Sequence, residues 1–421
     1  MALRADKTRD DILDDRMAGE TPAATMAKGS FSERQWTNCG GGRPARTESK
    51  RVRHWKLKEY DEKEKTMKAT RYGLVFAAAL IVAAGVWAAE DTDKPNIVIL
   101  ATGGTIAGSA ETQTQAGYTS GQVGVDVLIN AVPQIKELAD VTGEQISNVG
   151  SQDMSDAIWL KLAARINELA ASDKVDGIVI THGTDTIEET GYFLHLVLNT
   201  DKPVVLTAAM RPSTALSADG PLNIFNAVAV AADPDARGRG VLVVANDDIH
   251  GARSITKTNA TDVQTFMSPE RGLIGVSLYG VNRWFRYPYR THTAKSDFSI
   301  EGVKSLPRVD VIYITADVSP DLIDCAVANG AKALVTAGVG NGNMTGPALD
   351  AVKRAIEKGV VVVRATRVPS GSVGRNVEVN DDEVGTVVSG ELSPAKARVL
   401  LKLALLKTTD SAAIQSYFDL Y

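Results

Sequence analysis

The segment that decides the fold is NIVILATGGT, residues 96–105. It opens with consecutive apolar residues, Ile97 to Leu100, a pattern typical of a strand that is buried on both faces. Two adjacent glycines follow, and they let the backbone turn tightly beside the hydroxyl of Thr105. A buried strand that ends in a polar glycine turn indicates an α/β sheet that gathers ligands at the carboxyl ends of its strands.

Further apolar strands alternate with helical patterns on both sides of a polar, irregular stretch at 286–307. We therefore expect a larger N-terminal α/β domain (90–285) with a mostly parallel, mixed sheet covered by helices. A linker (286–307) and a smaller, flavodoxin-like C-terminal α/β domain (308–421) follow. The predicted strands are 96–101, 177–181, 204–208, 241–245, 309–315, 333–337 and 360–365. The predicted helices are 123–138, 155–169, 188–198, 219–232, 322–329, 347–358, 394–407 and 415–421.

The composition excludes several classes of protein. The 421 residues are 44% hydrophobic and 23% charged, as in a soluble globular protein. Residues 1–89 carry a net charge of +5 and the remainder carries −10. Because the part after residue 89 is this acidic, it is a poor partner for nucleic acid or an anionic membrane. Two cysteines, Cys39 and Cys325, and scattered histidines give no metal-binding spacing, so we expect no metal site.

The N-terminal region resembles a targeting segment. Basic residues at 68–71 precede the apolar run 74–89, which ends in small residues and is short for a membrane span. We therefore expect a signal peptide at 67–89, secretion to the periplasm and no stable membrane association after cleavage. Residues 1–66 are charged and aperiodic, and are predicted to be a disordered or non-native extension. The alternative is an uncleaved anchor with a cytoplasmic tail.

Three polar turns follow predicted strands at the expected ligand edge. The turn at Thr105 offers a nucleophile beside backbone N–H groups, although a phosphate-binding loop or a plain turn remains an alternative. Ser151 and Gln152 precede a helix, whose N-terminal N–H groups can bind a carboxylate, although simple capping of the helix by Ser151 or Asp153 is the alternative that the sequence alone favours. The segment 181–186 offers a hydroxyl, a carboxylate and helix N-terminal amides together.

Several other polar groups remain open to two interpretations. His182 is expected to be a packed strand-end residue, and a Ser-His-Asp triad with His182 or His250 is disfavoured because no G-x-S-x-G motif occurs. Lys257 is an ordinary solvated lysine unless it folds against a threonine. The loop 338–343 suits a polar small molecule but is equally typical of a flexible turn.

Taken together, these segments resemble the bacterial type II L-asparaginases and glutaminase-asparaginases over essentially all of residues 95–421. The similar motifs are ILATGGTIAG (99–108), THGTDT (181–186), AMRP (209–212), SADG (217–220), KTN (257–259) and GNGN (340–343). The resemblance implies an amidohydrolase that converts L-asparagine to L-aspartate and ammonia, uses no cofactor, and acts more weakly on L-glutamine. It also implies a homotetramer, built as a dimer of dimers with shared active sites.

The resemblance also implies residue roles. Thr105 corresponds to the nucleophile and Tyr118 to a residue of the mobile loop behind it. Thr184, Asp185 and Lys257 correspond to a second catalytic cluster. The implied substrate ligands are Ser151, Gln152, Thr184 and Asp185, with Asn343 and Glu378 supplied across a subunit interface. Either Tyr118 with Glu378, or Lys257 through Thr184, then activates the nucleophile.

Two departures and one rival class complete the interpretation. The disulfide of some relatives is absent, because Ser172 and Thr200 stand in the corresponding stretches. Ser151, Gln152 and Asn343 resemble the asparagine-preferring branch, whereas 279–286 resembles the dual-specificity branch. The rival is a periplasmic amino-acid-binding protein, which would need neither a hydroxyl nucleophile nor a lysine at its ligand.

Overall fold

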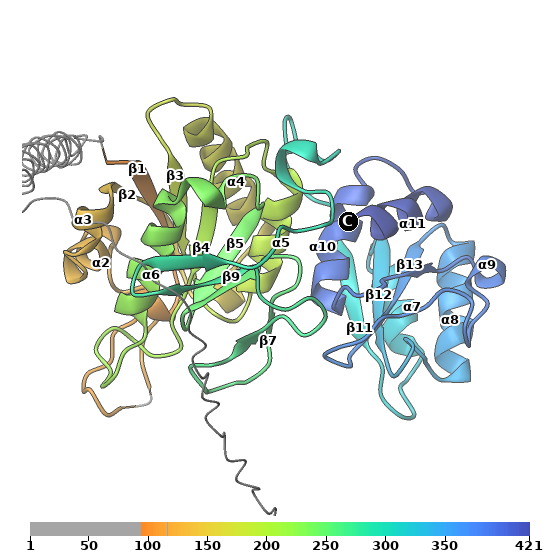
Figure 1. Cartoon of the computed structure of the whole chain (residues 1–421). Helices are drawn as coiled ribbons and strands as arrows, with labels where there is room; N and C mark the ends of the chain where they lie inside the picture. The colour runs from red at the N-terminus through yellow and green to blue at the C-terminus, as the bar shows by residue number, and fades with distance from the viewer. Residues whose placement is uncertain (1–93, 116) are drawn as a thin grey trace, which may run out of the picture. The chain divides into compact units, whose positions relative to one another are not determined.

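The computed structural model describes residues 94–115 and 117–421 (Figure 1). The expected N-terminal extension (1–66) and signal peptide (67–89) lie outside these residues. In the part of the chain that is described, no helix combines the length and apolar character that a membrane crossing requires.

The described chain alternates strands and helices from end to end. Its α-helices are α2 (Val125–Ala131), α3 (Ile135–Leu138), α4 (Asp156–Ala170), α5 (Ile187–Val197), α6 (Gly220–Ala232), α7 (Asp321–Ala328), α8 (Gly346–Glu357), α9 (Asp381–Val384), α10 (Pro394–Ala404) and α11 (Ser411–Leu420). The strands of the first sheet are β1 (Asn96–Gly103), β2 (Asp140–Val149), β3 (Gly177–Thr181), β4 (Val204–Thr207), β5 (Val241–Ala245), β6 (Asp248–Gly251), β9 (Gly275–Leu278) and β10 (Val281–Trp284). A short hairpin is formed by β7 (Thr256–Lys257) and β8 (Phe266–Met267). The second sheet consists of β11 (Val309–Tyr313), β12 (Ala333–Gly338), β13 (Val361–Thr366) and β14 (Val387–Val388).

The first sheet has eight strands in the order β10-β9-β6-β5-β4-β3-β1-β2. The strands from β5 to β2 are parallel, and β6, β9 and β10 continue the sheet in antiparallel pairs. The expected mostly parallel, mixed sheet is therefore confirmed. Strand β1 lies between the edge strand β2 and strand β3, and its residue Ile99 pairs with both Gly143 and Val179.

Alternate residues of the parallel strands face two separate apolar layers, as the two-residue period of a strand requires. Val98 and Leu100 pack among residues of α4 and α5. Ile97 and Ile99 pack among residues of α2, α3 and α6. Helices thus cover both faces of the sheet, which explains why these strands are continuous apolar runs in the sequence.

The helix predictions hold for α4 but fail at 123–138. Ser155 is the N-cap of α4, because its side chain accepts the N–H of Ile158 at 3.4 Å. The single helix expected at 123–138 is wrong, since the chain forms two short helices, α2 and α3, instead. Pro133 lies between them, and a proline disfavours helical backbone in the preceding residue, here Val132.

The second sheet contains four parallel strands in sequential order, β11-β12-β13-β14. Helices α7 and α8 supply Ile323 and Val352 to the apolar layer on one face. On the other face, α10 and α11 supply Leu400 and Ile414. The expected smaller α/β unit with a parallel sheet is confirmed.

The two sheets share one apolar core through α5 and α10. The cluster that contains Leu100 of β1 and Phe193 of α5 continues without a break to Leu400 of α10 and Val335 of β12. Ion pairs border this contact, with Lys402 Nζ 2.6 Å from Asp156 and Lys396 Nζ 3.5 Å from Glu188. These contacts fix the second sheet against the first.

Candidate active site

The site begins where the chain leaves β1 and β3, since the carboxyl ends of these parallel strands lie side by side. Gly104 has φ +80° and Gly183 follows β3, and a Cβ placed on Gly104 would lie 2.4 Å from the nitrogen of Gly183. A Cβ on Gly183 would in turn lie 2.5 Å from Ser151 Oγ. The turns before Thr105, Thr184 and Gln152 therefore touch, and only glycine permits this approach.

Thr105 is nearly buried and its hydroxyl is 2.6 Å from the hydroxyl of Tyr118, where either group can donate. The Tyr118 ring packs over Gly108, and the loop is pinned by the backbone pair Ser109–Thr119. The structure thus brings the predicted nucleophile and the predicted loop tyrosine into direct contact.

Lys257 joins the second predicted cluster. Its Nζ donates to Thr184 Oγ1 at 3.0 Å and to Asp185 Oδ1 at 2.6 Å. The hairpin of β7 and β8 presents this lysine, which is 73 residues away from Thr184 in the sequence. The lysine is folded against a threonine, as the functional interpretation of Lys257 required, and is not a solvated side chain.

Ser151 does not cap a helix. Its buried Oγ accepts the backbone N–H of Asp185 at 3.1 Å, and its carbonyl accepts the hydroxyl of Thr186 at 2.7 Å. The capping alternative is wrong for Ser151, because the N-cap of α4 is Ser155. Gln152 is exposed beside it, and its amide donates to Asp153 at 3.3 Å.

Asn343 and Glu378 form a separate pair in the second α/β unit, where the Asn343 amide donates to the Glu378 carboxylate. Among the hydrogen bonds of residues 94–115 and 117–421, none joins either of them to the residues around Thr105. The structure therefore assembles seven of the nine predicted site residues around three touching turns and pairs the remaining two elsewhere.

The histidines do not form a triad. Burial lowers the pKa of His182 to about 4, and its Nδ1 is 2.8 Å from the Gly183 carbonyl. Because a carbonyl only accepts, Nδ1 carries the proton and the ring is neutral at neutral pH. Burial also lowers the pKa of His250 to about 4, and this ring contacts Ser268. Neither histidine bonds a carboxylate within the described part of the chain.

The phosphate-loop alternative for 102–108 is also disfavoured. The N–H of Gly104 donates to the Val149 carbonyl at 2.9 Å, so this amide is committed within the sheet. A phosphate loop instead points its amides at the ligand.

The sequence interpretation missed the groups that hold the Tyr118 loop. Ser213 donates its N–H and its hydroxyl to the Gly108 carbonyl, and Thr214 Oγ1 accepts the N–H of Ala110. They belong to the loop after the AMRP segment, about 105 residues from their partners. A serine and a threonine in a loop carry no local signal that would predict these contacts.

Comparison with known proteins decides the family. The family model "Asparaginase, N-terminal" matches residues 96–289, and "Glutaminase/Asparaginase C-terminal domain" matches residues 308–418. The chain belongs to the asparaginase family.

Individual relatives agree with this assignment. The chain is 49% identical to the "Probable L-asparaginase periplasmic" of Haemophilus influenzae, over 84% of this chain and 99% of that protein. It is 50% identical to "L-asparaginase 2" of Escherichia coli, over 78% of this chain and 93% of that protein. The structure resembles the "Probable Cytoplasmic L-asparaginase" of Campylobacter jejuni with a TM-score of 0.76 and 45% identity, over 78% of this chain and all of that one.

Membership makes the chain an amidohydrolase and removes the rival class of amino-acid-binding proteins. In the described residues no three His, Cys, Asp or Glu side chains are grouped so as to hold a metal ion.

Proposed function

We propose that this asparaginase hydrolyses the side-chain amide of L-asparagine to L-aspartate and ammonia through an acyl-enzyme on Thr105. The contact between the Thr105 and Tyr118 hydroxyls carries the proposal. An amide is a poor electrophile, so a covalent intermediate divides the difficult step in two. Thr105 Oγ attacks the amide carbon, ammonia leaves with a proton, and water then hydrolyses the resulting ester.

The nucleophile needs a base, because a neutral hydroxyl attacks weakly. The 2.6 Å contact supports Tyr118 as the group that takes the proton of Thr105 directly. Lys257 contacts Thr184 and not Thr105, so the route through Thr184 needs one more transfer or a water molecule. We therefore assign the first proton transfer to Tyr118 and the support of Thr184 to Lys257.

The substrate is a zwitterion, and the surrounding groups have complementary charges. Asp185 and Glu378 suit its ammonium group. Ser151, Gln152 and Asn343 offer hydrogen bonds, and the amides at the start of α5 offset the negative charge of the α-carboxylate. Asp185 serves both Lys257 and the substrate, so binding and catalysis share one carboxylate.

The proposed active site is shared between subunits of a homotetramer, a dimer of dimers. Asn343 and Glu378 bond to each other and not to the Thr105 cluster, which supports their supply to a neighbouring subunit. The isolated monomer is then inactive. Dilution that dissociates the protein, measured by sedimentation velocity, should abolish ammonia release in parallel.

We further propose the domain limits 90–285 and 308–421 with a linker at 286–307, and export to the periplasm through the signal peptide 67–89. The relatives differ on this last point, since one is called periplasmic and another cytoplasmic. N-terminal sequencing of the exported protein tests it. Residues 1–66 attached to that protein would contradict the proposal.

The decisive experiment compares the purified enzyme with the variant Thr105→Ala. We expect the variant to lose ammonia release while it still binds asparagine in calorimetry. Turnover by the variant would remove Thr105 from its role, and tight asparagine binding without turnover by the unmodified protein would refute the hydrolase. The same assay with L-glutamine is expected to show the weaker reaction.

A further inference from the structure

We propose that Arg364 and Asp381 are positioning residues that hold Asn343 and Glu378 in the geometry that recognises the substrate ammonium. The inference rests on the proposed function for the identity of that ligand. Neither residue touches the substrate in this proposal, and each acts through the two loops that carry Asn343 and Glu378.

Arg364 is the largest side chain of the described chain that is completely buried. It belongs to β13, a strand that is otherwise apolar apart from its last residue. Burying a guanidinium is costly unless every N–H finds an acceptor. A charge in the centre of a sheet therefore needs an explanation beyond packing.

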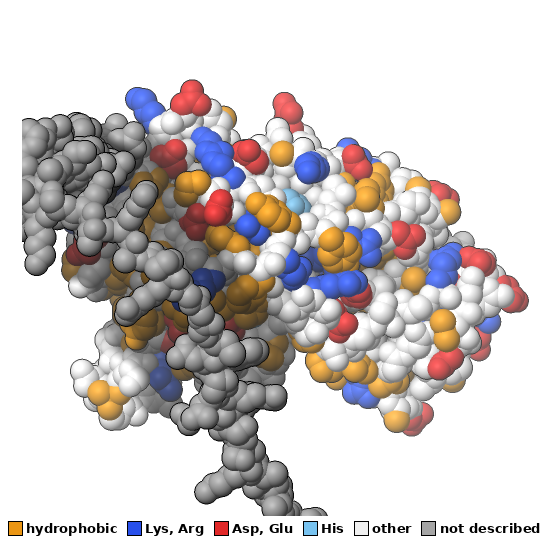
Figure 2. Space-filling view, in the orientation of Figure 1, with side chains coloured by type: hydrophobic (Ala, Val, Ile, Leu, Met, Phe, Trp, Pro, Cys, Tyr) orange, Lys and Arg blue, Asp and Glu red, His pale blue; other side chains and the backbone are white. Residues whose placement is uncertain are grey.

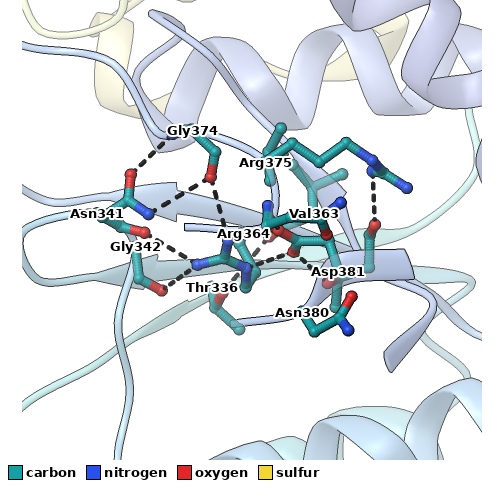
Figure 3. A network of polar contacts seen from close by, with 12 residues as sticks. Thr336, Asn341, Gly342, Val363, Arg364, Gly374, Arg375, Asn380 and Asp381 are labelled. Carbon is teal, nitrogen blue, oxygen red and sulfur yellow. Dashed lines mark hydrogen bonds and ion pairs between the residues drawn. The ribbon is translucent and has the colours of Figure 1, made fainter. Parts of the chain in front are cut away.

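All five N–H groups of Arg364 have acceptors (Figure 3). Nε and Nη2 donate to the two oxygens of Asp381 at 2.7 and 2.8 Å, which is the bidentate geometry that only arginine provides. Nη1 donates to the carbonyls of Asn341 and Gly342, and Nη2 also reaches the carbonyl of Gly374.

Asp381 is satisfied to the same degree. Besides Arg364, it accepts the hydroxyl of Thr386 and the N–H of Asn376. Burial alone would raise the pKa of this carboxyl, but these hydrogen bonds more than offset it and hold the pKa below its ordinary value. Asp381 therefore remains charged, and the pair is a fully bonded buried ion pair.

The acceptors lie in two particular loops. Asn341 and Gly342 immediately precede Asn343, in a turn with φ +53° at Gly340 and +73° at Gly342. Gly374 and Asn376 lie in the loop that carries Glu378, and Asn376 has the unusual φ of +56°. One buried arginine thus binds the backbone of both loops and places the two side chains within hydrogen-bonding distance.

The side chain of Asn341 joins the two loops a second time. Its Oδ1 accepts the N–H of Gly374 at 2.7 Å and its Nδ2 donates to the Gly374 carbonyl at 3.4 Å. This amide is partly exposed and can be removed without leaving a buried charge. Asn341 therefore allows the positioning role to be tested without breaking the ion pair.

The test uses two substrates that differ in one group. Succinamate has the scissile amide and the carboxylate of asparagine but lacks the ammonium group. The variants are Arg364→Lys, which keeps the charge but has three donors without the planar fork, and Asn341→Ala. Glu378→Gln is the reference for a lost ammonium contact. Arg354→Lys is the control, since Arg354 pairs with Asp324 at 2.6 Å on the surface helices α8 and α7.

We expect Arg364→Lys and Asn341→Ala to lower kcat/KM for asparagine by roughly tenfold or more, chiefly through KM, and for succinamate by less than about twofold. In a double variant with Glu378→Gln, each substitution should lower kcat/KM for asparagine little further, because the contact of Glu378 with the substrate ammonium is already lost. Arg354→Lys should leave both substrates unchanged. Two results would overturn the positioning role. One is an equal loss of kcat/KM for asparagine and succinamate. The other is an unchanged ratio of these two kcat/KM values in Arg364→Lys and Asn341→Ala when Glu378→Gln does change it.

A second measurement does not depend on activity. Hydrogen exchange of the intact Arg364→Lys protein should accelerate in peptides covering 339–343 and 373–381, and remain unchanged in those covering β1 and β3. Unchanged exchange at both loops would refute the proposal. Failure of the unmodified enzyme to release ammonia from asparagine would instead refute the proposed function, and the exchange experiment would still decide whether Arg364 fixes the two loops.

Discussion

The contact between Gly104 and Gly183 gives the sharpest prediction, because it ties backbone geometry to the position of Thr105, the proposed nucleophile. In Gly104→Ala the new methyl group would lie 2.4 Å from the Gly183 nitrogen and 2.5 Å from its Cα, whereas ordinary contacts begin at 3.4 Å. Both neighbours are backbone atoms, so no flexible side chain can move aside. The loops that carry Thr105 and Thr184 must separate by about 1 Å.

The expected magnitudes follow from this displacement. A misplacement of about 1 Å at reacting groups costs roughly 100-fold in rate, so kcat/KM for asparagine should fall by about that factor. With φ +80° and ψ −176°, Gly104 lies in a backbone region that is essentially restricted to glycine, so an alanine there adds roughly 1–3 kcal/mol of strain and lowers the free energy of unfolding. Steady-state ammonia release and urea unfolding measure the two effects separately.

The matched control is Gly238→Ala. Gly238 has φ +68°, and a Cβ there would meet no atom within 4 Å. This variant also places a side chain at a positive φ but without the steric contact, so it should lose stability and keep its activity. A folded Gly104→Ala protein with unmodified kcat/KM would refute the argument that the close approach positions the nucleophile. Equal losses of activity in both variants would do so too.

Three further outcomes are expected. Tyr118→Phe should lower kcat by roughly 100-fold or more, since the base is lost, and an unchanged kcat would transfer that role to Lys257. Lys257→Met should lower kcat, because the ammonium group that donates to Thr184 is lost. The control is Lys202→Met, which should leave kcat unchanged, since the Lys202 ammonium donates to the Ser172 carbonyl. Equal effects of the two substitutions would contradict a specific role for Lys257. Burial lowers the pKa of His182 from about 6.5 to about 4, so the unfolded chain binds a proton between these values before the folded protein does. The contribution of His182 to stability is therefore complete above about pH 6.5 and falls toward pH 4 by up to about 3 kcal/mol. His182→Asn should make the decline of the urea midpoint with falling pH less steep, and an unaltered slope would contradict the assignment.

The parallel core of the fold was predictable because strands covered on both faces are continuous apolar runs. The antiparallel edge was not. In β10 the side chains alternate, with Val281 exposed and Trp284 donating to Asp233, and the strand has only four residues. Tyr279 and Gly280 make its turn with positive φ, yet tyrosine is rarely found there, so the usual hairpin signal is missing.

The site was only partly predictable, and the reason is distance along the chain. Thr105 and Thr184 could be placed together, because each follows a strand at the same edge of a parallel sheet. Lys257 reaches them through the short hairpin of β7 and β8, whose two-residue strands leave no periodic pattern. Its role came from resemblance, and the two hydrogen bonds of its Nζ now give that role a geometric basis.

The charges on the surface explain why the substrate must be recognised locally. Acidic and basic side chains are interspersed over the uncovered part of the face in Figure 2, so this face offers no single field to attract a zwitterion. Recognition then depends on a few groups held at fixed positions. Around Thr105 that fixity comes from touching glycines, whereas Asn343 and Glu378 lie in loops without such contacts to the first sheet. The buried Arg364–Asp381 pair supplies it there. Three of the five N–H groups of Arg364 donate to backbone carbonyls of the two loops, and the other two donate to Asp381. Each half of the proposed site therefore has its own set of fixing contacts, and each can be loosened by mutation without breaking the contacts of the other.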